Sequence, residues 1–188
     1  LQFNNCFFEN NQSSWGGVFS CGAANNNLYF MNCTFLNNTA SGYGGVISHG
    51  SANNPNYNEF LFNNCTIKDN HASYGGVISA ANCGNYCYSS KNEFINCEII
   101  NNTADNDGGV HYADSYNTGG FFALNTLFKE NTANRGGIFC SESVGSEYSF
   151  INSNFIDNGS INNGGIGYRS CGGGGFEISS CNFINNYS

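Results

Sequence analysis

The side chains in this sequence that are best suited to catalysis or metal binding belong to ten cysteines, three histidines and thirteen acidic residues. His111 and Asp114, which follow the Gly108-Gly109 pair, form the best local acid–base pair. General acid–base catalysis requires such groups to meet in a cleft, but polar residues at a strand end explain this spacing more simply. The other acids are scattered, so the converging carboxylates of a polysaccharide hydrolase are not expected. The sequence therefore predicts no enzyme.

Neither a metal site nor a nucleic-acid site is indicated. The chain has no C-x-x-C or H-x3-H spacing, which zinc sites typically show. Its five Lys and Arg residues and its formal net charge of −8 oppose the binding of a phosphate backbone. No run of eighteen apolar residues is present, so no membrane span is predicted. We expect no cofactor, no metal, no nucleic acid and no membrane span.

The elements that must position these residues repeat along the chain. The stretch CTFLNNTASGYGGVIS, residues 33–48, returns as CFFENNQSSWGGVFS from residue 6 and as CTIKDNHASYGGVIS from residue 65. Later copies begin at residues 97, 126, 153 and 181. Each copy has Phe or Ile two positions after its start, an invariant Asn three positions later and, in the first six, a Gly-Gly pair. The invariant residues are Asn11, Asn38, Asn70, Asn102, Asn131, Asn158 and Asn186.

This repeat predicts a β-solenoid. No apolar face persists at helical spacing, and short alternating strands separated by corners suit one coil of about three strands. We predict an all-β, right-handed parallel β-helix of about six and a half coils, with roughly 28 residues per coil. Residues 1–188 would form a single domain, as a segment of or subunit in a longer assembly. Asn would bend the chain and stack as a hydrogen-bonded ladder, and Gly-Gly would form a second corner.

The pair of motifs resembles a known family. The motif F-x-x-N followed by G-G-[VI] is similar to the repeats of chlamydial polymorphic membrane proteins and related Pmp-like β-helix proteins. Its closest copy in this chain consists of Phe35 to Asn38 and Gly44 to Ile47. The resemblance covers nearly the whole chain, through six paired copies and a seventh F-x-x-N. It implies surface-exposed, secreted passenger domains with adhesive or structural roles, and it implies no catalytic residues.

The cysteines allow two interpretations. Cys6, Cys33, Cys65 and Cys97 share the first repeat position and are expected to point inward, either as small buried residues or as disulfides between successive coils. Two further pairs are expected. Cys83 and Cys87 lie together in one insert, and Cys140 and Cys171 fall near equivalent places in adjacent coils. The disulfide candidates are Cys6, Cys33, Cys65, Cys97, Cys83, Cys87, Cys140 and Cys171. Their connectivity is not determined by the sequence.

Glycosylation motifs are frequent. Seven N-x-S/T sequons begin at Asn11, Asn32, Asn37, Asn64, Asn101, Asn158 and Asn186. Together with the cysteines they favour an oxidising context, and we expect a secreted chain that carries N-linked glycans outside the cell or at its surface. Asn37, Asn101 and Asn158 look better placed than Asn32 and Asn64, which adjoin inward-facing cysteines.

The variable segments predict where a partner binds. The longest inserts, residues 49–59 and 80–93, would emerge on one face, where Tyr57, Tyr86 and Tyr88 form a ridge suited to sugar or protein contact. We therefore expect a secreted, glycosylated structural or adhesive β-helix in a filament, stalk or surface coat. Its partners would be further copies of itself, other extracellular proteins or glycans. A polysaccharide-binding or polysaccharide-cleaving, pectin-lyase-like module is the alternative.

Overall fold

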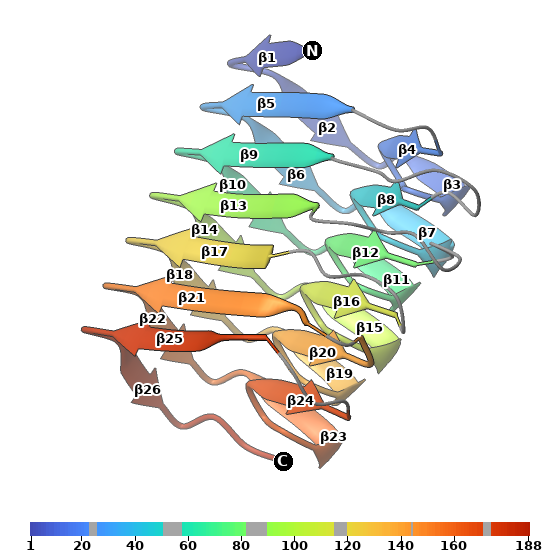
Figure 1. The fold of residues 1–188 in the computed structure, drawn as a ribbon. Coiled ribbons are helices and arrows are strands. Elements are labelled where there is room, and N and C mark those ends of the chain that lie inside the picture. The colour runs from blue at the N-terminus through green and yellow to red at the C-terminus, as the bar shows by residue number, and fades with distance from the viewer. Residues whose placement is uncertain (23–25, 51–57, 82–89, 115–119, 144, 171–173) are drawn as a thin grey trace.

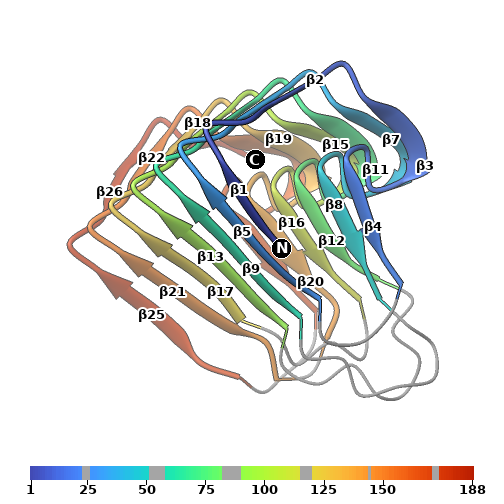
Figure 2. The same cartoon turned by 90° about the horizontal axis from the view of Figure 1, so that it is seen from above.

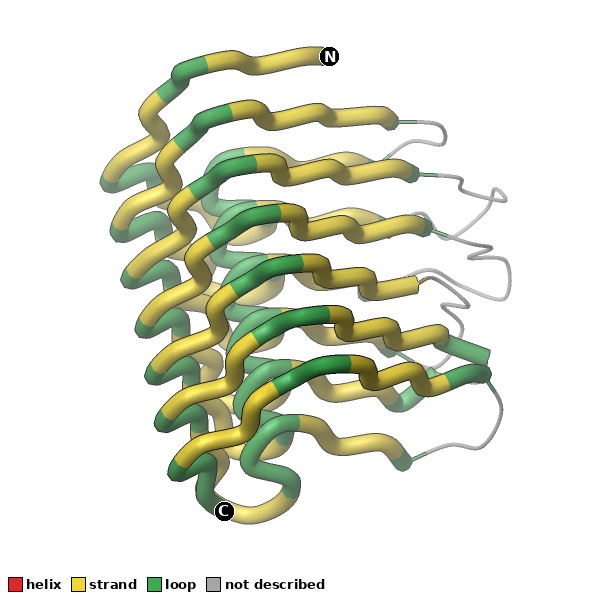
Figure 3. Tube along the Cα trace, turned by 90° about the vertical axis from the view of Figure 1, so that its left-hand side faces the viewer, coloured by secondary structure: helices red, strands yellow, loops and turns green. Residues whose placement is uncertain are grey.

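The computed structural model describes residues 1–22, 26–50, 58–81, 90–114, 120–143, 145–170 and 174–188. The chain winds into a stack of coils (Figure 1). Successive coils are joined by parallel strand pairing, so that four sheets run along the stack. The described residues are strands joined by short corners and contain no helix (Figure 3).

We name the sheets A to D in the order in which a coil enters them. Sheet A contains β1 (Gln2–Asn4), β5 (Asn27–Met31), β9 (Glu59–Asn63), β13 (Lys91–Ile95), β17 (Gly120–Leu124), β21 (Glu147–Ile151) and β25 (Phe176–Ser179). Sheet B contains β2 (Phe7–Glu9), β6 (Thr34–Leu36), β10 (Thr66–Lys68), β14 (Glu98–Ile100), β18 (Leu127–Lys129), β22 (Asn154–Ile156) and β26 (Asn182–Ile184). Sheet C contains β3 (Gln12–Trp15), β7 (Thr39–Tyr43), β11 (His71–Tyr74), β15 (Thr103–Asp107), β19 (Thr132–Arg135) and β23 (Gly159–Asn163). Sheet D contains β4 (Phe19–Cys21), β8 (Ile47–His49), β12 (Ile78–Ala80), β16 (His111–Ala113), β20 (Phe139–Ser141) and β24 (Gly167–Arg169).

The predicted fold class is confirmed, with two corrections. Seen from the N-terminal end, the chain runs clockwise from β1 through β2 and β3 to β4 while it recedes, which makes a right-handed parallel β-helix (Figure 2). Each coil has four strands and not the expected three, because the Gly-Gly bend divides one side into sheets C and D. The buried core extends from Cys21 to Ser160, about five turns and slightly fewer than the six and a half coils predicted.

Two corners of each coil use a left-handed backbone. The residue that ends the A–B corner, Asn5 or its equivalent in later coils, has a φ of 49–56°. The B–C corner has a φ of 52–57° at the residue before the invariant Asn, as at Asn37 and Asp69. Asn tolerates this region better than other residues with a Cβ. The bend therefore falls on the residue preceding the invariant Asn, and not on that Asn itself.

The third corner requires glycine at both positions of its pair. Gly44, the first of its pair, has a φ of 67°, a conformation that favours glycine. A Cβ on Gly45 would lie 2.2 Å from the carbonyl oxygen of Gly76 in the next coil. The second glycine is therefore fixed by the close approach of stacked backbones, and this explains why the pair recurs in each complete coil.

The invariant asparagines stack inside the solenoid. Nδ2 of Asn38 donates to Oδ1 of Asn70 at 2.9 Å, and the backbone N–H of Asn38 donates to the same oxygen at 2.9 Å. A second hydrogen bond from Nδ2 of Asn38 goes to the carbonyl oxygen of Phe8 at 3.0 Å. The same pattern continues from Asn70 to Asn102 and onward to Asn186, with Nδ2 to Oδ1 distances of 2.9–3.0 Å. A buried carboxamide is thus fully paired at every step.

Columns of aromatic and aliphatic side chains fill the space beside this ladder. Phe30, Phe62 and Phe94 stack from one coil to the next with ring centroids 4.9 Å apart. The next member of that column is Ala123, and the ring of Phe121 lies 5.2 Å from that of Phe94 and occupies the interior instead. Stacking therefore continues through the coil in which the repeat itself fails.

The cysteine column packs as thiols and does not form disulfides. Cys6, Cys21, Cys33, Cys65, Cys97, Cys140 and Cys181 are free, and they are all the cysteines that the structure describes. The Sγ of Cys97 donates to the carbonyl oxygen of Phe62 at 3.3 Å, and Thr126 makes the equivalent bond to Phe94 at 3.2 Å. In-register parallel strands hold stacked Cβ atoms about 4.8 Å apart, whereas a disulfide requires about 3.5–4.5 Å.

The expected cross-coil bridges among Cys6, Cys33, Cys65 and Cys97 are therefore corrected to a column of small buried residues. Cys140 is likewise a free, buried thiol. Cys83, Cys87 and Cys171 lie outside the described residues.

Replacing a ladder residue should be costly. Asn102→Ala leaves the backbone N–H of Asn70 and the carbonyl of Ile67 without their side-chain partner, and each unpaired buried group costs about 1–3 kcal/mol. We expect a loss of about 3 kcal/mol or more in the free energy of unfolding, measured by urea denaturation. Asn63→Ala, on the outer face of β9, is the matched control and should cost about 0.5 kcal/mol or less. Equal losses for the two variants would contradict the ladder.

Candidate functional site

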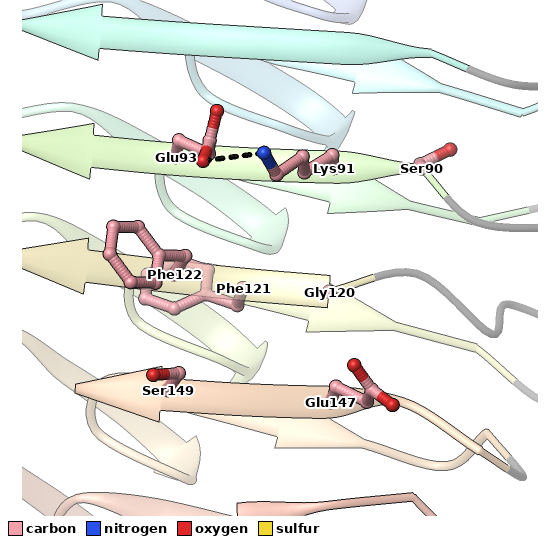
Figure 4. Close-up of a pocket in the computed structure, with 8 residues that line it drawn as sticks. All are labelled: Ser90, Lys91, Glu93, Gly120, Phe121, Phe122, Glu147 and Ser149. Atoms are coloured by element: carbon pink, nitrogen blue, oxygen red, sulfur yellow. Dashed lines mark ion pairs between the residues drawn. The ribbon is translucent and has the colours of Figure 1, made fainter. Parts of the chain in front are cut away.

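The outer face of sheet A has a recess where β13, β17 and β21 lie side by side (Figure 4). Lys91, Gly120 and Glu147 are register partners across these strands. Glycine has no side chain, so the middle strand leaves a gap between its two charged neighbours. The recess has a volume of about 540 Å³ and is also lined by Ser90, Glu93, Phe121, Phe122 and Ser149.

Polar groups surround one aromatic ring in this recess. Phe122 is half-buried and lies between Glu93 and Ser149 in its column. Nζ of Lys91 lies 2.8 Å from Oε1 of Glu93, and Oγ of Ser149 donates to Oε2 of Glu177 at 2.9 Å. This arrangement can accept and donate hydrogen bonds beside an apolar surface. Ser90, which also lines the recess, is 2% exposed, and its Oγ lies 3.5 Å from Nδ1 of the buried His49.

The acid–base candidate His111 is enclosed in the core. His111 is 1% exposed and its ring packs against Phe121, with the centroids 5.0 Å apart. Its Nε2 lies 3.3 Å from Nδ2 of Asn92, an arrangement in which the amide donates and the ring nitrogen accepts. Burial lowers the pKa of His111 to about 3, and the charge of His49 adds to the shift. A neutral ring inside the core cannot reach a substrate together with Asp114.

A second buried histidine lies in the same part of the core. His49 is 2% exposed, its ring centroid is 5.0 Å from that of Phe60, and burial lowers its pKa to about 3. Among the described residues, no three His, Cys, Asp or Glu side chains are grouped so that they could hold a metal ion. The two histidines therefore act on stability.

Sheets C and D are joined by an ionic cluster. Arg135 donates through Nε and Nη2 to the two carboxylate oxygens of Asp107 at 2.7 and 2.6 Å, and through Nη2 to Oε1 of Glu142 at 2.7 Å. Its guanidinium carbon also lies 4.9 Å from the ring centroid of Tyr168. Because Asp107 is nearly buried, at 3% exposure, this pairing offsets the cost of enclosing a charge. The cluster holds the two sheets together.

An aromatic column runs along the end of sheet C. The rings of Trp15 and Tyr43 are 4.7 Å apart, and those of Tyr43 and Tyr74 are 5.1 Å apart. These residues precede the Gly-Gly pair in three successive coils, a signal that the aligned repeats contain. The predicted tyrosine ridge of Tyr57, Tyr86 and Tyr88 lies outside the described residues.

The sequons differ in exposure. Asn11, Asn32, Asn37, Asn64 and Asn101 are exposed, and Asn186 is half-buried. The expectation that Asn32 and Asn64 are enclosed is wrong, because their side chains turn outward at the A–B corner. Asn158 is 0% exposed and its Nδ2 donates to Phe128 and Asn186, so the expectation that it is well placed for a glycan is wrong as well.

Comparison with known proteins agrees with this geometry. The model of the Chlamydia polymorphic membrane protein (Chlamydia_PMP) repeat matches residues 32–50. These residues include β6, β7, β8 and the two corners between them. This match and the parallel β-helix fold both fit a Pmp-like repeat in this part of the chain. No curated protein and no solved structure matches it.

The solenoid is all-β in its described part. Those residues include no helix long and apolar enough to cross a membrane. Motif reading missed both features. The recess does not belong to the repeat, whereas the aromatic column occupies one repeat position before Gly-Gly and could have been found from the aligned copies. Gly120 and Phe122 stand at outward positions that the repeat leaves variable.

The buried histidines should make stability pH-dependent. Their folded pKa values are lowered, so below the ordinary value of about 6.5 the unfolded chain binds protons that the folded chain does not. The stabilisation is complete above that pH and is lost as the pH falls towards 3, by about 1.4 kcal/mol per pH unit for each histidine.

The variant His111→Phe should remove one of these contributions, since Phe139 already occupies the same register position in the next coil. Denaturation midpoints between pH 7 and pH 4 measure the slope. Asn63→Ala, which changes no titratable group on the outer face of β9, is the control and should keep the slope of the parent chain. An unchanged slope in His111→Phe would contradict the assignment.

Proposed function

We propose that the chain is a surface-exposed, adhesive β-helix that acts by displaying its outer sheet faces. The proteins that share its repeat are surface-exposed. The observation that carries the proposal is the division of each strand into two sets. Inward positions are committed to ladders and aromatic columns, while outward positions of sheet A form a recess that no packing role explains.

A rigid scaffold supports this role. Parallel pairing along four sheets holds every outward side chain at a fixed height, and binding sites on regular elements are better preorganised than sites on loops. Contact with a partner would therefore cost little ordering. We propose a non-catalytic role, which the burial of His111 supports because it removes the best acid–base candidate from the surface.

Secretion and N-glycosylation form the second part of the proposal. Four exposed sequon asparagines, Asn32, Asn37, Asn64 and Asn101, lie on the corners of the solenoid, where a glycan would extend away from the core. Asn11 is exposed as well, but its Nδ2 donates to Oδ1 of Asn38 in the ladder. The free, buried cysteines carry no weight here, because packing accounts for them. We also propose self-association into longer rods, supported by in-register ladders that a further coil can extend.

Polysaccharide binding is a second candidate, favoured by the carboxylates and the aromatic ring of the recess. Cleavage would require a general acid beside the scissile bond. An oligosaccharide depolymerisation assay tests for cleavage directly. If the chain shows turnover, and changing Glu93 or Glu147 abolishes it, the recess is a catalytic site and not only a binding site.

Adhesion should be saturable and should require the folded chain. We expect the fluorescently labelled chain to bind epithelial cell layers or extracellular matrix, and the same chain after heat denaturation to lose that binding. Electron microscopy of the same preparation should show rods joined end to end. Binding no stronger than that of the unfolded chain would contradict adhesion, and uniformly single short rods would contradict self-association.

Glycan occupancy should follow exposure. When the chain passes through a eukaryotic secretory pathway, glycopeptide mass spectrometry should find glycans at some of Asn11, Asn32, Asn37, Asn64 and Asn101. Asn158 should be unmodified, because its amide is enclosed and hydrogen-bonded. A glycan on Asn158, or none on the exposed set, would contradict the proposal.

A further inference from the structure

We propose that the recess over Gly120 binds a short neutral oligosaccharide. A sugar ring would pack on Phe122, and the carboxylate of Glu147 would accept hydrogen bonds from its hydroxyls. This inference rests on the proposed adhesive function and names the class of ligand for the same site. Four observations carry it: a glycine between two charged register partners, an aromatic ring between two polar register partners, a carboxylate without a partner among the described residues, and the size and charge of the recess.

Gly120 is not required by the fold. It lies on a central strand of sheet A, in register with Lys91 and Glu147, and the earlier members of that column, Asn27 and Glu59, also carry side chains. Its φ is not in the left-handed region, and an added Cβ would meet only the carbonyl oxygen of Glu147 at 3.7 Å, an ordinary contact. Gly120 is the first residue of β17, and its lack of a side chain leaves open the space between Lys91 and Glu147 on the outer face.

Phe122 supplies an apolar surface among polar neighbours. Its register partners are Glu93 on one side and Ser149 on the other, and Figure 4 draws its ring on the same part of the sheet as these two side chains, with Gly120 at the start of the strand. A half-buried aromatic ring on an outer sheet face offers a flat contact area at little conformational cost. The C–H faces of a sugar ring are complementary to such a surface.

The polar groups of the recess are unequally engaged. Glu93 is paired with Lys91, and Ser149 donates to Glu177. Glu147 is exposed and makes no hydrogen bond or ion pair with the other described residues. A carboxylate accepts strong, charge-assisted hydrogen bonds from hydroxyl groups. Glu147 is therefore the acceptor available to a ligand.

Size and charge select the ligand class. A volume of about 540 Å³ falls within the range of small-molecule sites and exceeds what one inserted side chain of a partner protein would fill. The net charge of −8 and the two glutamates oppose an acidic sugar. Lys91, the only cation among the described residues that line the recess, is already paired with Glu93. A neutral oligosaccharide meets both conditions.

The test compares variants of the full chain on an array of neutral di- to tetrasaccharides of hexoses and N-acetylhexosamines, with hits measured by calorimetry. Gly120→Thr, Phe122→Ala and Glu147→Gln should each weaken binding by about tenfold or more, as expected for central contacts. Gly120→Thr should also raise the melting temperature, because it replaces a strand glycine without a clash. Loss of affinity in a more stable protein cannot be attributed to misfolding.

Two variants serve as matched controls. Leu124→Ala changes an outward apolar residue of the same strand, and Glu98→Gln removes a carboxylate from sheet B. Both should bind like the parent chain. The inference is overturned if no neutral oligosaccharide binds, if only a basic peptide or an acidic sugar binds, or if the recess variants bind as well as the controls.

The adhesion assay run in parallel separates this inference from the proposed function. Cell binding that persists in a chain without oligosaccharide binding would overturn the ligand class and leave adhesion in place. Failure of the folded chain in both assays would overturn both.

Discussion

The corner between sheets B and C places backbone N–H groups inside a dry core, and the asparagine ladder is the interaction that pairs them. Each Oδ1, such as that of Asn70, accepts one hydrogen bond from the side chain and one from the backbone of the preceding coil. A coil displaced by one residue would lose both and would turn its apolar side chains outward. The ladder therefore sets the register, and the register places Phe over Phe and Gly over Gly throughout the stack.

Because the inward positions hold the coils together, the outward positions of the solenoid are free to vary in sequence. The inward positions tolerate few changes, since the aromatic columns and the glycine corners depend on close contact between coils. The outward positions carry the features that differ between coils, among them the recess over Gly120, the aromatic column at Tyr43 and the cluster around Arg135. Function in such a molecule is grafted onto a frame whose shape does not depend on it.

The fold was predictable because the signals that specify it recur in each coil. The site was not, because Gly120 and Phe122 matter only once β17 is aligned with its neighbours, and inserts of different length hide that register in the sequence. Two motif readings failed for a related reason. A sequon does not show whether its Asn lies on the exposed bend, as Asn37 does, or one residue later in the buried ladder, as Asn158 does. Cysteines at a stacked position suggest disulfides until the spacing of their Cβ atoms is considered.

The central claim is that the invariant asparagines form a continuous buried ladder, and hydrogen exchange of their side chains tests it most directly. Assigned carboxamide signals of Asn38, Asn70, Asn102 and Asn131 should exchange as slowly by NMR as the amides of the central strands. Those of the exposed corner residues Asn37 and Asn101 should exchange rapidly. Equally rapid exchange in both sets would contradict the ladder, and with it the account of register and shape.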